Sequence, residues 1–255
     1  MLFRSGCDGC LEAGDDLAAI FASPFRHDAF VDQEAPEPAY ARRARELCDE
    51  AGAMLIIDEV RAGFRLERGS SWSALGVRPD LSAWGKCFAN GHPISALLGS
   101  DSCREGAGSI YATGSFWLSA VPMAAALETL RIIRETDYIE HSVALGERLR
   151  AGLDAAATKH GFTLRQTGPV QMPQIMFADD PDFRVGYGWA EEMLARGIYM
   201  HPWHNMFLCA AMIEADIDAT IVAADAAFAA VSARRATLEP HPILVMLAAA
   251  QAEHA

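Results

Sequence analysis

The sequence has 255 residues and a formal net charge of −13, and 51% of its residues are hydrophobic while 22% are charged. This composition is typical of a folded globular protein and unlike that of a disordered chain. The acidic balance argues against a nucleic-acid partner, because a negative surface repels phosphate backbones. No apolar run approaches the roughly 18–20 residues of a membrane helix, so we expect no membrane association.

The first residues, MLFRSGCDGC, lack the apolar core of a signal peptide. We therefore expect a cytoplasmic protein whose six cysteines are reduced thiols. Cys7 and Cys10 form a single CxxC, but a tetrahedral zinc site needs two more ligands and no second CxxC occurs. The sequence predicts no metal site there.

The first half of the chain alternates predicted strands and helices. DLAAIFASPF (16–25) predicts a short buried strand and a loop. EAPEPAYARRARELCDEAGA predicts a helix that prolines open and that ends near Gly52. AMLIIDEV is an unbroken apolar run, typical of a parallel strand buried on both faces. LSAWGKC predicts a second strand, and ANGHPISALLGS is interpreted as a loop.

Two long helices are predicted next, one from near Val121 through IIRET and one over about 139–160, before the pattern changes at Gly161. FTLRQTG, VQMPQIMF, GIYMHP and MFLCAAM then predict short strands, and DFRVGYGWAEEMLARG and EADIDATIVAADAAFAAV predict helices. Alternating strands and helices indicate an α/β first half, and short mixed strands indicate an α+β second half. We place the two domains at 1–135 and 136–255.

The stretch LIIDEVRAGF runs from an apolar strand straight into Asp58 and Glu59. It could be the polar end of a buried strand, the acidic strand of a P-loop ATPase, or a strand end that presents a carboxylate for chemistry. The ATPase also needs GxxxxGK[ST]. The only Gly-Lys pair is Gly85-Lys86, which is followed by Cys87 and has no glycine five positions before it. The ATPase interpretation is therefore excluded.

Lys86 lies between a tryptophan two residues before it and a cysteine and a phenylalanine after it, with no adjacent charge. Most lysines are solvated surface charges, but this setting predicts partial burial, which favours the neutral amine. A neutral amine can attack a carbonyl and form a Schiff base. A Schiff-base lysine together with an aspartate is what pyridoxal phosphate requires: the lysine holds the aldehyde, and the aspartate keeps the pyridine nitrogen protonated.

Three stretches occur in an order that resembles one enzyme family: LIIDEVRAGFR, GVRPDLSAWGKCFANGHPISALLGS and YATGSFWLSAVPMAAALETL. They are similar to the motifs of class-III pyridoxal-phosphate aminotransferases, above all glutamate-1-semialdehyde aminomutase and its relatives. The resemblance runs from about residue 16 to the C-terminus. It implies part of a fold-type-I transferase: a large α/β domain with a mostly parallel sheet, a small C-terminal α+β domain, and a homodimer with shared active sites.

The resemblance also implies roles for four residues. Asp58 matches the aspartate that pairs with the pyridine nitrogen, and Lys86 matches the Schiff-base lysine that later moves the proton. Val60 matches the apolar residue on one face of the cofactor ring. Ser115, in TGSF, matches a threonine that reaches the cofactor phosphate in the partner subunit's site. From the residues alone, Val60 could equally be core packing and Ser115 a turn serine, and Glu59 has no assigned role.

Two departures from the family pattern stand out. Relatives often carry SGNP where this chain has LSAV, with a proline only at Pro122. In the family, a long segment that supplies the phosphate cradle and the second ring-stacking residue precedes the position of Met1. Nothing in MLFRSGCDGCLEAG resembles those parts. The resemblance therefore implies the C-terminal portion of such an enzyme.

Other polar residues give weaker signals. His201 and His204 form an HxxH that could bind a metal or a substrate, but no supporting ligand stands nearby in the sequence, and a structural role is favoured. Arg61 and Arg165 could each grip a carboxylate through a bidentate fork, although a solvated arginine is the simpler interpretation.

Two functions remain open on the sequence. The first is pyridoxal-phosphate-dependent transfer of an amino group to or from a small amino acid or amino aldehyde, by a transaminase or an aminomutase. The second is a non-enzymatic fragment or dimerising subunit that lacks the phosphate-binding half.

Overall fold

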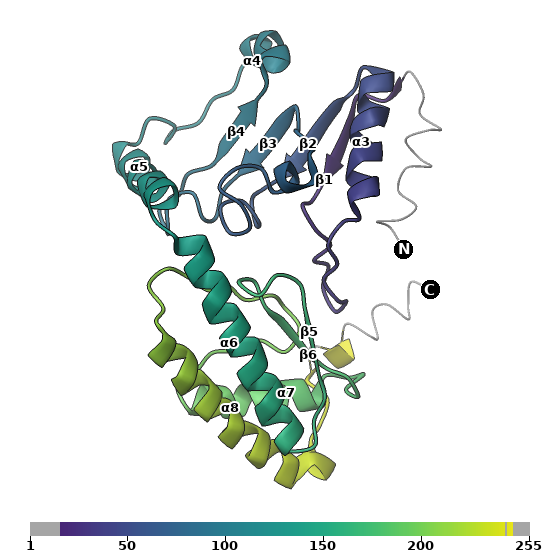
Figure 1. Ribbon diagram of the computed structural model, residues 1–255, viewed down its shortest axis with the longest axis vertical. Coiled ribbons are helices and arrows are strands. Elements are labelled where there is room, and N and C mark those ends of the chain that lie inside the picture. Colours follow the sequence, from purple (N-terminus) through teal and green to yellow (C-terminus); the bar gives the residue numbers. More distant parts are fainter. Residues whose placement is uncertain (1–15, 243, 247–255) are drawn as a thin grey trace. The chain divides into compact units, whose positions relative to one another are not determined.

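The computed structural model describes residues 16–242 and 244–246 (Figure 1). The chain forms two compact units. The first comprises the described residues up to Arg26 together with Ala35–Ile139, and the second comprises His27–Glu34 together with the described residues from Glu140 onward. The division after Ile139 lies close to the boundary placed at 135, whereas the return of His27–Glu34 to the second unit was not predicted.

The first unit is built on a four-stranded sheet in the order β1-β2-β3-β4. Its strands are β1 (Ala19–Ala22), β2 (Met54–Asp58), β3 (Leu81–Trp84) and β4 (Ala96–Gly99). β1 and β3 both pair in parallel with β2, which confirms the predicted α/β architecture. β4 runs antiparallel to β3 and lies where the sequence predicted a loop. The four residues of β4 show no alternation of apolar and polar side chains that would predict a strand. They form one because they pair with the free edge of β3.

Helix α3 (Pro38–Ala51) covers β1 and β2. A proline in its first turn and Gly52 in the left-handed conformation after its last turn confirm the predicted ends. On β2, Leu55 and Ile57 are fully buried in the cluster that includes this helix, while the alternate residues are half-buried. Burial thus alternates along β2: one face is fully buried, and the other, which was predicted to be buried as well, is half-buried.

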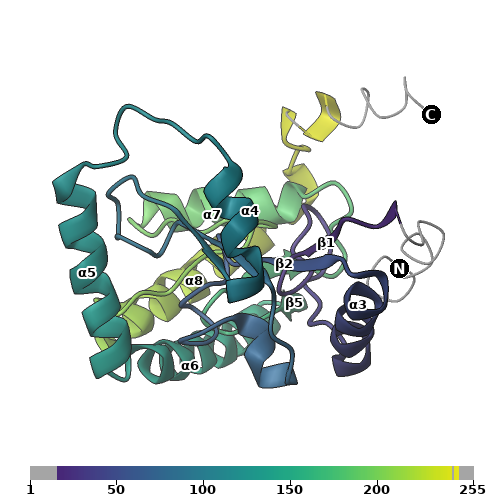
Figure 2. The same ribbon diagram turned by 90° about the horizontal axis from the view of Figure 1, so that it is seen from above.

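The remaining elements of the first unit are short helices and one long helix. They are η2 (Ser71–Leu75), η3 (Asp101–Cys103), α4 (Arg104–Ser109) and α5 (Ala120–Glu135). Phe64, Trp84 and Ile133 form a small cluster between α5 and the sheet. The stretch between α4 and α5 is a long loop in both Figure 1 and Figure 2, and residues 110–118 are exposed.

The second unit is α+β, as predicted. Its hairpin of β5 (Leu164–Thr167) and β6 (Gln174–Phe177) is antiparallel. Its helices are α6 (Tyr138–Lys159), α7 (Arg184–Ala195) and α8 (Glu214–Arg234), followed by the short η4 (Arg235–Thr237). The first two residues of α6 precede Glu140, where the second unit resumes.

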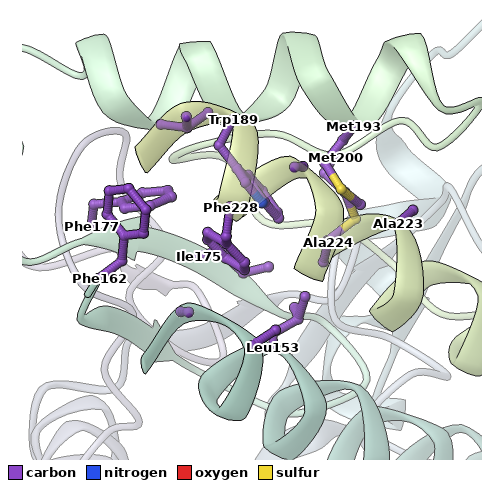
Figure 3. Packing of buried hydrophobic residues seen from close by; sticks show 14 of the residues in the cluster. Leu153, Phe162, Ile175, Phe177, Trp189, Met193, Met200, Ala223, Ala224 and Phe228 are labelled. Atoms are coloured by element: carbon purple, nitrogen blue, oxygen red, sulfur yellow. The ribbon is translucent and has the colours of Figure 1, made fainter. Parts of the chain in front are cut away.

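One aromatic core holds the second unit together. Trp189 of α7 and Phe228 of α8 are fully buried and stack with their ring centroids 5.3 Å apart. Phe177 of β6 approaches both rings at 6.0 Å, and Phe162 lies 5.8 Å from Phe228. Figure 3 shows these side chains turned toward one another between the hairpin and the helices. Each buried ring removes a large apolar area from water, so this cluster stabilises the unit.

Two predicted strands, GIYMHP and MFLCAAM, are loops in the structure. Met206 N donates to Pro173 O (2.8 Å) and Leu208 N donates to Gln171 O (3.0 Å), but these bonds do not extend into a ladder. Pro202, which lacks an N–H, interrupts the run before them. Across the described residues, no helix has both the length and the apolar character that crossing a membrane requires.

A buried pair of glutamines ties residues 27–34 to the second unit. Gln33 N donates to Thr167 Oγ1 (3.0 Å), and Gln33 Nε2 donates to Met172 O (3.2 Å). Gln174 Nε2 in turn donates to Val31 O (2.9 Å). These long-range bonds explain why a segment so early in the sequence belongs to the second unit.

Candidate functional site

The candidate site lies at the carboxyl ends of two adjacent parallel strands. Asp58 is the last residue of β2, and Lys86 follows the end of β3 by two residues. The register pairs Asp58 with Ala83, so the sheet brings both ends to the same edge. In open α/β sheets, ligands bind outside the carboxyl ends of the strands. The fold therefore places the predicted aspartate and lysine where such a sheet binds its ligand.

Asp58 is a half-buried carboxylate with a fixed orientation. Its Oδ1 accepts a hydrogen bond from the backbone N–H of Val60 (3.0 Å). Its Oδ2 has no hydrogen-bond partner among the described residues. The turn thus holds Oδ1, while Oδ2 can accept a hydrogen bond from a ligand, which suits the predicted pairing with a protonated ring nitrogen.

Val60 lies against the backbone that leads into Lys86. A Cβ placed on Gly85 would lie 3.4 Å from Val60 Cγ1, an ordinary van der Waals contact. Val60 is half-buried, so part of its apolar surface remains available. The structure therefore puts the Asp58 carboxylate and the Val60 side chain beside the backbone segment that carries Lys86.

Lys86 itself is exposed, which corrects the predicted partial burial. The apolar neighbours that suggested burial face a different environment: Trp84 is buried with Phe64 and Ile133, and Cys87 and Phe88 pack against the same cluster. Burial of these neighbours does not draw the lysine in with them. Lys86 forms no hydrogen bond or ion pair with any described residue, so its amine is accessible.

Ser115 lies in the exposed stretch before α5, and the structure does not join it to Asp58 or Lys86 by any contact among the described residues. Its neighbours are large and apolar: Phe116 is 86% and Leu118 90% exposed. The role that the resemblance assigns to Ser115 concerns another subunit's site, so it stays a prediction.

Glu59 is the residue of this region whose role the sequence did not reveal. It is fully buried, and its carboxylate accepts three hydrogen bonds from Ser70 and Ser71. Burial raises the pKa of Glu59 above its ordinary value, although these three donors oppose the shift. The sequence offers the adjacent pair Ser70 and Ser71 as possible donors to Glu59. The pair lies more than ten positions after Glu59, so the sequence alone does not reveal the contact.

An open cavity of about 840 Å³ lies elsewhere on the first unit. Arg68, Arg78, Trp84 and Leu98 contribute to its lining. None of Asp58, Val60, Lys86 and Ser115 lines this cavity, so it is separate from the candidate site.

The other polar candidates take part in local structure. Arg165 pairs with Asp32 (Nε to Oδ1, 3.4 Å) and is therefore not an unoccupied carboxylate fork. His201 Nδ1 accepts hydrogen bonds from the backbone N–H groups of Trp203 (3.4 Å) and His204 (3.0 Å). This bonding makes the HxxH a compact turn. Arg61 is half-buried and already has an interaction partner.

Metal binding has no structural support in the part of the chain that the structure describes. No group of three or more His, Cys, Asp or Glu side chains there could hold a metal ion. Cys7 and Cys10, the CxxC weighed in the sequence, lie outside the described residues.

Comparison with known proteins identifies the family. The family model for class-III aminotransferases matches residues 11–216, and the chain belongs to this family. An aminopentol aminotransferase from Sphingopyxis macrogoltabida is 61% identical over 235 residues, which cover 92% of this chain and 56% of the relative. A 3-aminobutyryl-CoA aminotransferase from Cloacimonas acidaminovorans is 30% identical, over 84% of this chain and 53% of its own. The chain thus spans about half the length of the curated relatives it matches.

Solved structures agree with this assignment. The FumI protein of a Sphingopyxis species, described in its pyridoxal-phosphate internal aldimine form, has a TM-score of 0.93 and 59% identity, over 95% of this chain and 58% of its own. An omega-transaminase from Sphaerobacter thermophilus has a TM-score of 0.75 and 27% identity, over 89% of this chain and 55% of its own. These similarities confirm the predicted family, transferase fold and cofactor.

One part of the predicted resemblance needs correction. A glutamate-1-semialdehyde 2,1-aminomutase from Bacillus thuringiensis is only 33% identical, over 86% of this chain and 54% of its own. The aminopentol aminotransferase is nearly twice as similar. The resemblance assigns the motifs around Asp58 and Lys86 to the cofactor, which both kinds of enzyme use, so these motifs could not separate an aminomutase from an aminotransferase.

Proposed function

We propose that this chain is the part of a pyridoxal-phosphate-dependent aminotransferase that carries the reactive lysine and the pyridine-pairing aspartate. The observation that supports the proposal most strongly is the parallel pairing of β2 and β3, because Asp58 ends β2 and Lys86 follows β3 by two residues at the same end of the sheet. Val60 lies within contact distance of the Gly85 position and so adds an apolar side chain next to the segment that carries Lys86.

Pyridoxal phosphate, when bound, supplies an aldehyde that takes up amino groups and a pyridinium ring that withdraws electrons. In this proposal Lys86 Nζ would hold the cofactor aldehyde as an imine, with loss of one water molecule. The Lys86 amine would also carry the proton to and from the reacting carbon of the substrate. Asp58 Oδ2 would accept a hydrogen bond from the protonated ring nitrogen, and Val60 would supply an apolar surface for the ring.

The substrate is proposed from the relatives. The 61% identical relative is an aminopentol aminotransferase, which favours a transaminase acting on an aminopentol-like amine over one acting on an amino acid or amino aldehyde. Aminomutase activity remains an alternative that the 33% identical relative supports less well. A non-catalytic fragment or dimerising subunit is the remaining alternative, and the half-length match to the relatives is the observation behind it.

We also propose a homodimer in the cytoplasm. The exposed apolar side chains beside Ser115, including Phe116 and Leu118, support a protein partner for this stretch, because a contiguous apolar surface on a monomer is costly. In such a dimer, the Ser115 hydroxyl would donate to the cofactor phosphate of the other subunit. The cytoplasmic location stays a prediction from the sequence.

The proposal is tested by amino transfer from an aminopentol to a keto acid in the presence of pyridoxal phosphate. Asp58→Asn removes the negative charge that holds the ring proton, and we expect turnover to fall by a factor of about 10²–10⁴. Asp101→Asn is the matched control, because Asp101 is an exposed aspartate whose carboxylate pairs with Arg104. Turnover of Asp58→Asn equal to that of the unchanged chain would rule out the assigned role. No turnover by the unchanged chain would favour the fragment alternative.

A further inference from the structure

Glu59 is a buried acid beside the proposed site that amino transfer does not use. It follows Asp58 directly and precedes Val60, and only 1% of its surface is exposed. Burying a carboxylate is unfavourable unless hydrogen bonds compensate for the lost water. The partners of Glu59 therefore indicate what the buried acid contributes.

All three of its hydrogen-bond donors come from two adjacent serines. Glu59 Oε1 accepts from Ser71 N (2.6 Å) and Ser70 Oγ (2.9 Å), and Oε2 accepts from Ser71 Oγ (2.7 Å). Ser71 is the first residue of η2, where backbone N–H groups lack partners within the helix. The carboxylate thus caps this short helix and joins both ends of the loop formed by residues 60–69.

Other contacts hold the same loop between its ends. Arg68 donates from Nε to Ile133 O (3.0 Å) and from Nη2 to Thr136 O (2.8 Å), at the end of α5. Gly63 N donates to Glu59 O (2.7 Å). A Cβ on Gly63 would lie 2.6 Å from both Glu59 O and the Trp84 ring, so the turn packs closely here and has no room for a side chain. The loop is fixed at its start, middle and end.

We propose that Glu59 is a positioning residue for Asp58. By holding Ser70 and Ser71, it fixes the turn in which the Val60 N–H meets Asp58 Oδ1, and so sets the direction of the carboxylate. The use of that carboxylate rests on the proposed function, whereas the fixed geometry does not. Glu59 acts through Val60 and Asp58.

Amide hydrogen exchange on the whole chain, without cofactor, tests this proposal. Glu59→Ala leaves the donors of Ser70 and Ser71 unpaired, and we expect exchange at the Val60 amide to rise about tenfold while exchange at Leu55, inside β2, changes less than about twofold. Glu59→Gln should restore slow exchange, because its amide oxygen can accept from Ser71 N and its amide nitrogen can donate to Ser71 Oγ.

Ser73→Ala is the matched control, since Ser73 is exposed in the same short helix and should leave Val60 unaffected. An equal rise at Val60 and Leu55 in Glu59→Ala would show general destabilisation and overturn the positioning role. Unchanged exchange at Val60 would overturn it as well. If Glu59→Ala does not fold, Ser71→Ala removes the Oε2 donor alone, and unchanged Val60 exchange in that variant contradicts the proposal.

The outcome is separable from the proposed function. Because no cofactor or substrate enters the exchange measurement, fast Val60 exchange in Glu59→Ala supports positioning even if the chain transfers no amino group. Conversely, amino transfer that proceeds while Val60 exchange is unaffected by Glu59→Ala contradicts the positioning role and leaves the proposed function in place.

Discussion

The two units of this chain differ in how completely they bury their apolar side chains. The second unit gathers Trp189, Phe228, Phe177 and their neighbours into one continuous core. Among the residues that the structure describes, the first unit has smaller clusters around β2 and around Trp84. It leaves large apolar side chains exposed on its strands, its long loop and α5: Phe21, Leu97, Leu98, Ile110, Tyr111, Phe116, Trp117, Leu118, Val121 and Leu127.

This difference indicates different requirements for folding. The second unit packs Phe177, Trp189 and Phe228 among its own helices and hairpin, so this core is internal to the unit, although Tyr199 and Val222 stay exposed. The first unit carries the candidate site and also presents apolar surface that only another polypeptide surface would remove from water. Changes in the core of the second unit should therefore affect stability, and changes on the exposed stretch of the first unit should affect association.

The largest effect is expected in the core of the second unit. Phe228→Ala removes a fully buried ring that contacts Phe162, Phe177 and Trp189, and should lower the free energy of unfolding by about 3–5 kcal/mol. Val222→Ala, 71% exposed on the same helix, should change it by less than about 0.5 kcal/mol. Urea denaturation followed by circular dichroism measures both. Similar midpoints for the two variants would mean that α8 is not part of a stabilising core.

A change in the exposed stretch of the first unit should have the opposite profile. Leu118→Ser removes an apolar side chain that is 90% exposed, so the unfolding free energy should stay within about 0.5 kcal/mol of that of the unchanged chain. Self-association should weaken, which light scattering coupled to size-exclusion chromatography would detect. If the dimer persists unchanged, or if the chain is monomeric throughout, the dimer contact does not lie here.

A smaller effect is expected from pH on the second unit. Burial, with a contribution from His204, lowers the pKa of His201 below its ordinary value of 6.5. Between the lowered pKa and 6.5, the unfolded chain binds a proton that the folded chain does not, so stability is full above 6.5 and falls as the pH drops through this window. His201→Gln should reduce the difference between urea midpoints at pH 8 and pH 5.5. An undiminished difference would assign the pH dependence to other groups.

The sequence predicted the elements of both units well where the pattern was long or well bounded. Gly52 and the prolines before α3 marked a helix, and the apolar run into Asp58 marked a parallel strand. β4 was missed because its pairing depends on the edge of β3. The prediction of a strand at GIYMHP was wrong: these apolar residues lie in a loop, and Pro202 has no N–H to pair with a neighbouring strand.

The candidate site was predictable in part for the same reason. Asp58 and Lys86 were singled out because Asp58 ends one recognisable strand and Lys86 follows another. The parallel pairing of these strands puts both residues at the same end of the sheet, and their roles stay predictions. The prediction that Lys86 is partly buried was wrong, because apolar neighbours in the sequence do not determine where one side chain points. Glu59 received no role because its serine partners lie far along the chain and only folding brings them into contact.

The absorption spectrum of the purified chain mixed with pyridoxal phosphate tests the central claim most directly. If Lys86 at the end of β3 binds the cofactor, the spectrum should show a band from the covalent link that is absent in Lys86→Ala and retained in Lys159→Ala, a surface lysine paired with Asp225. A spectrum of Lys86→Ala identical to that of the unchanged chain would contradict the assignment of Lys86.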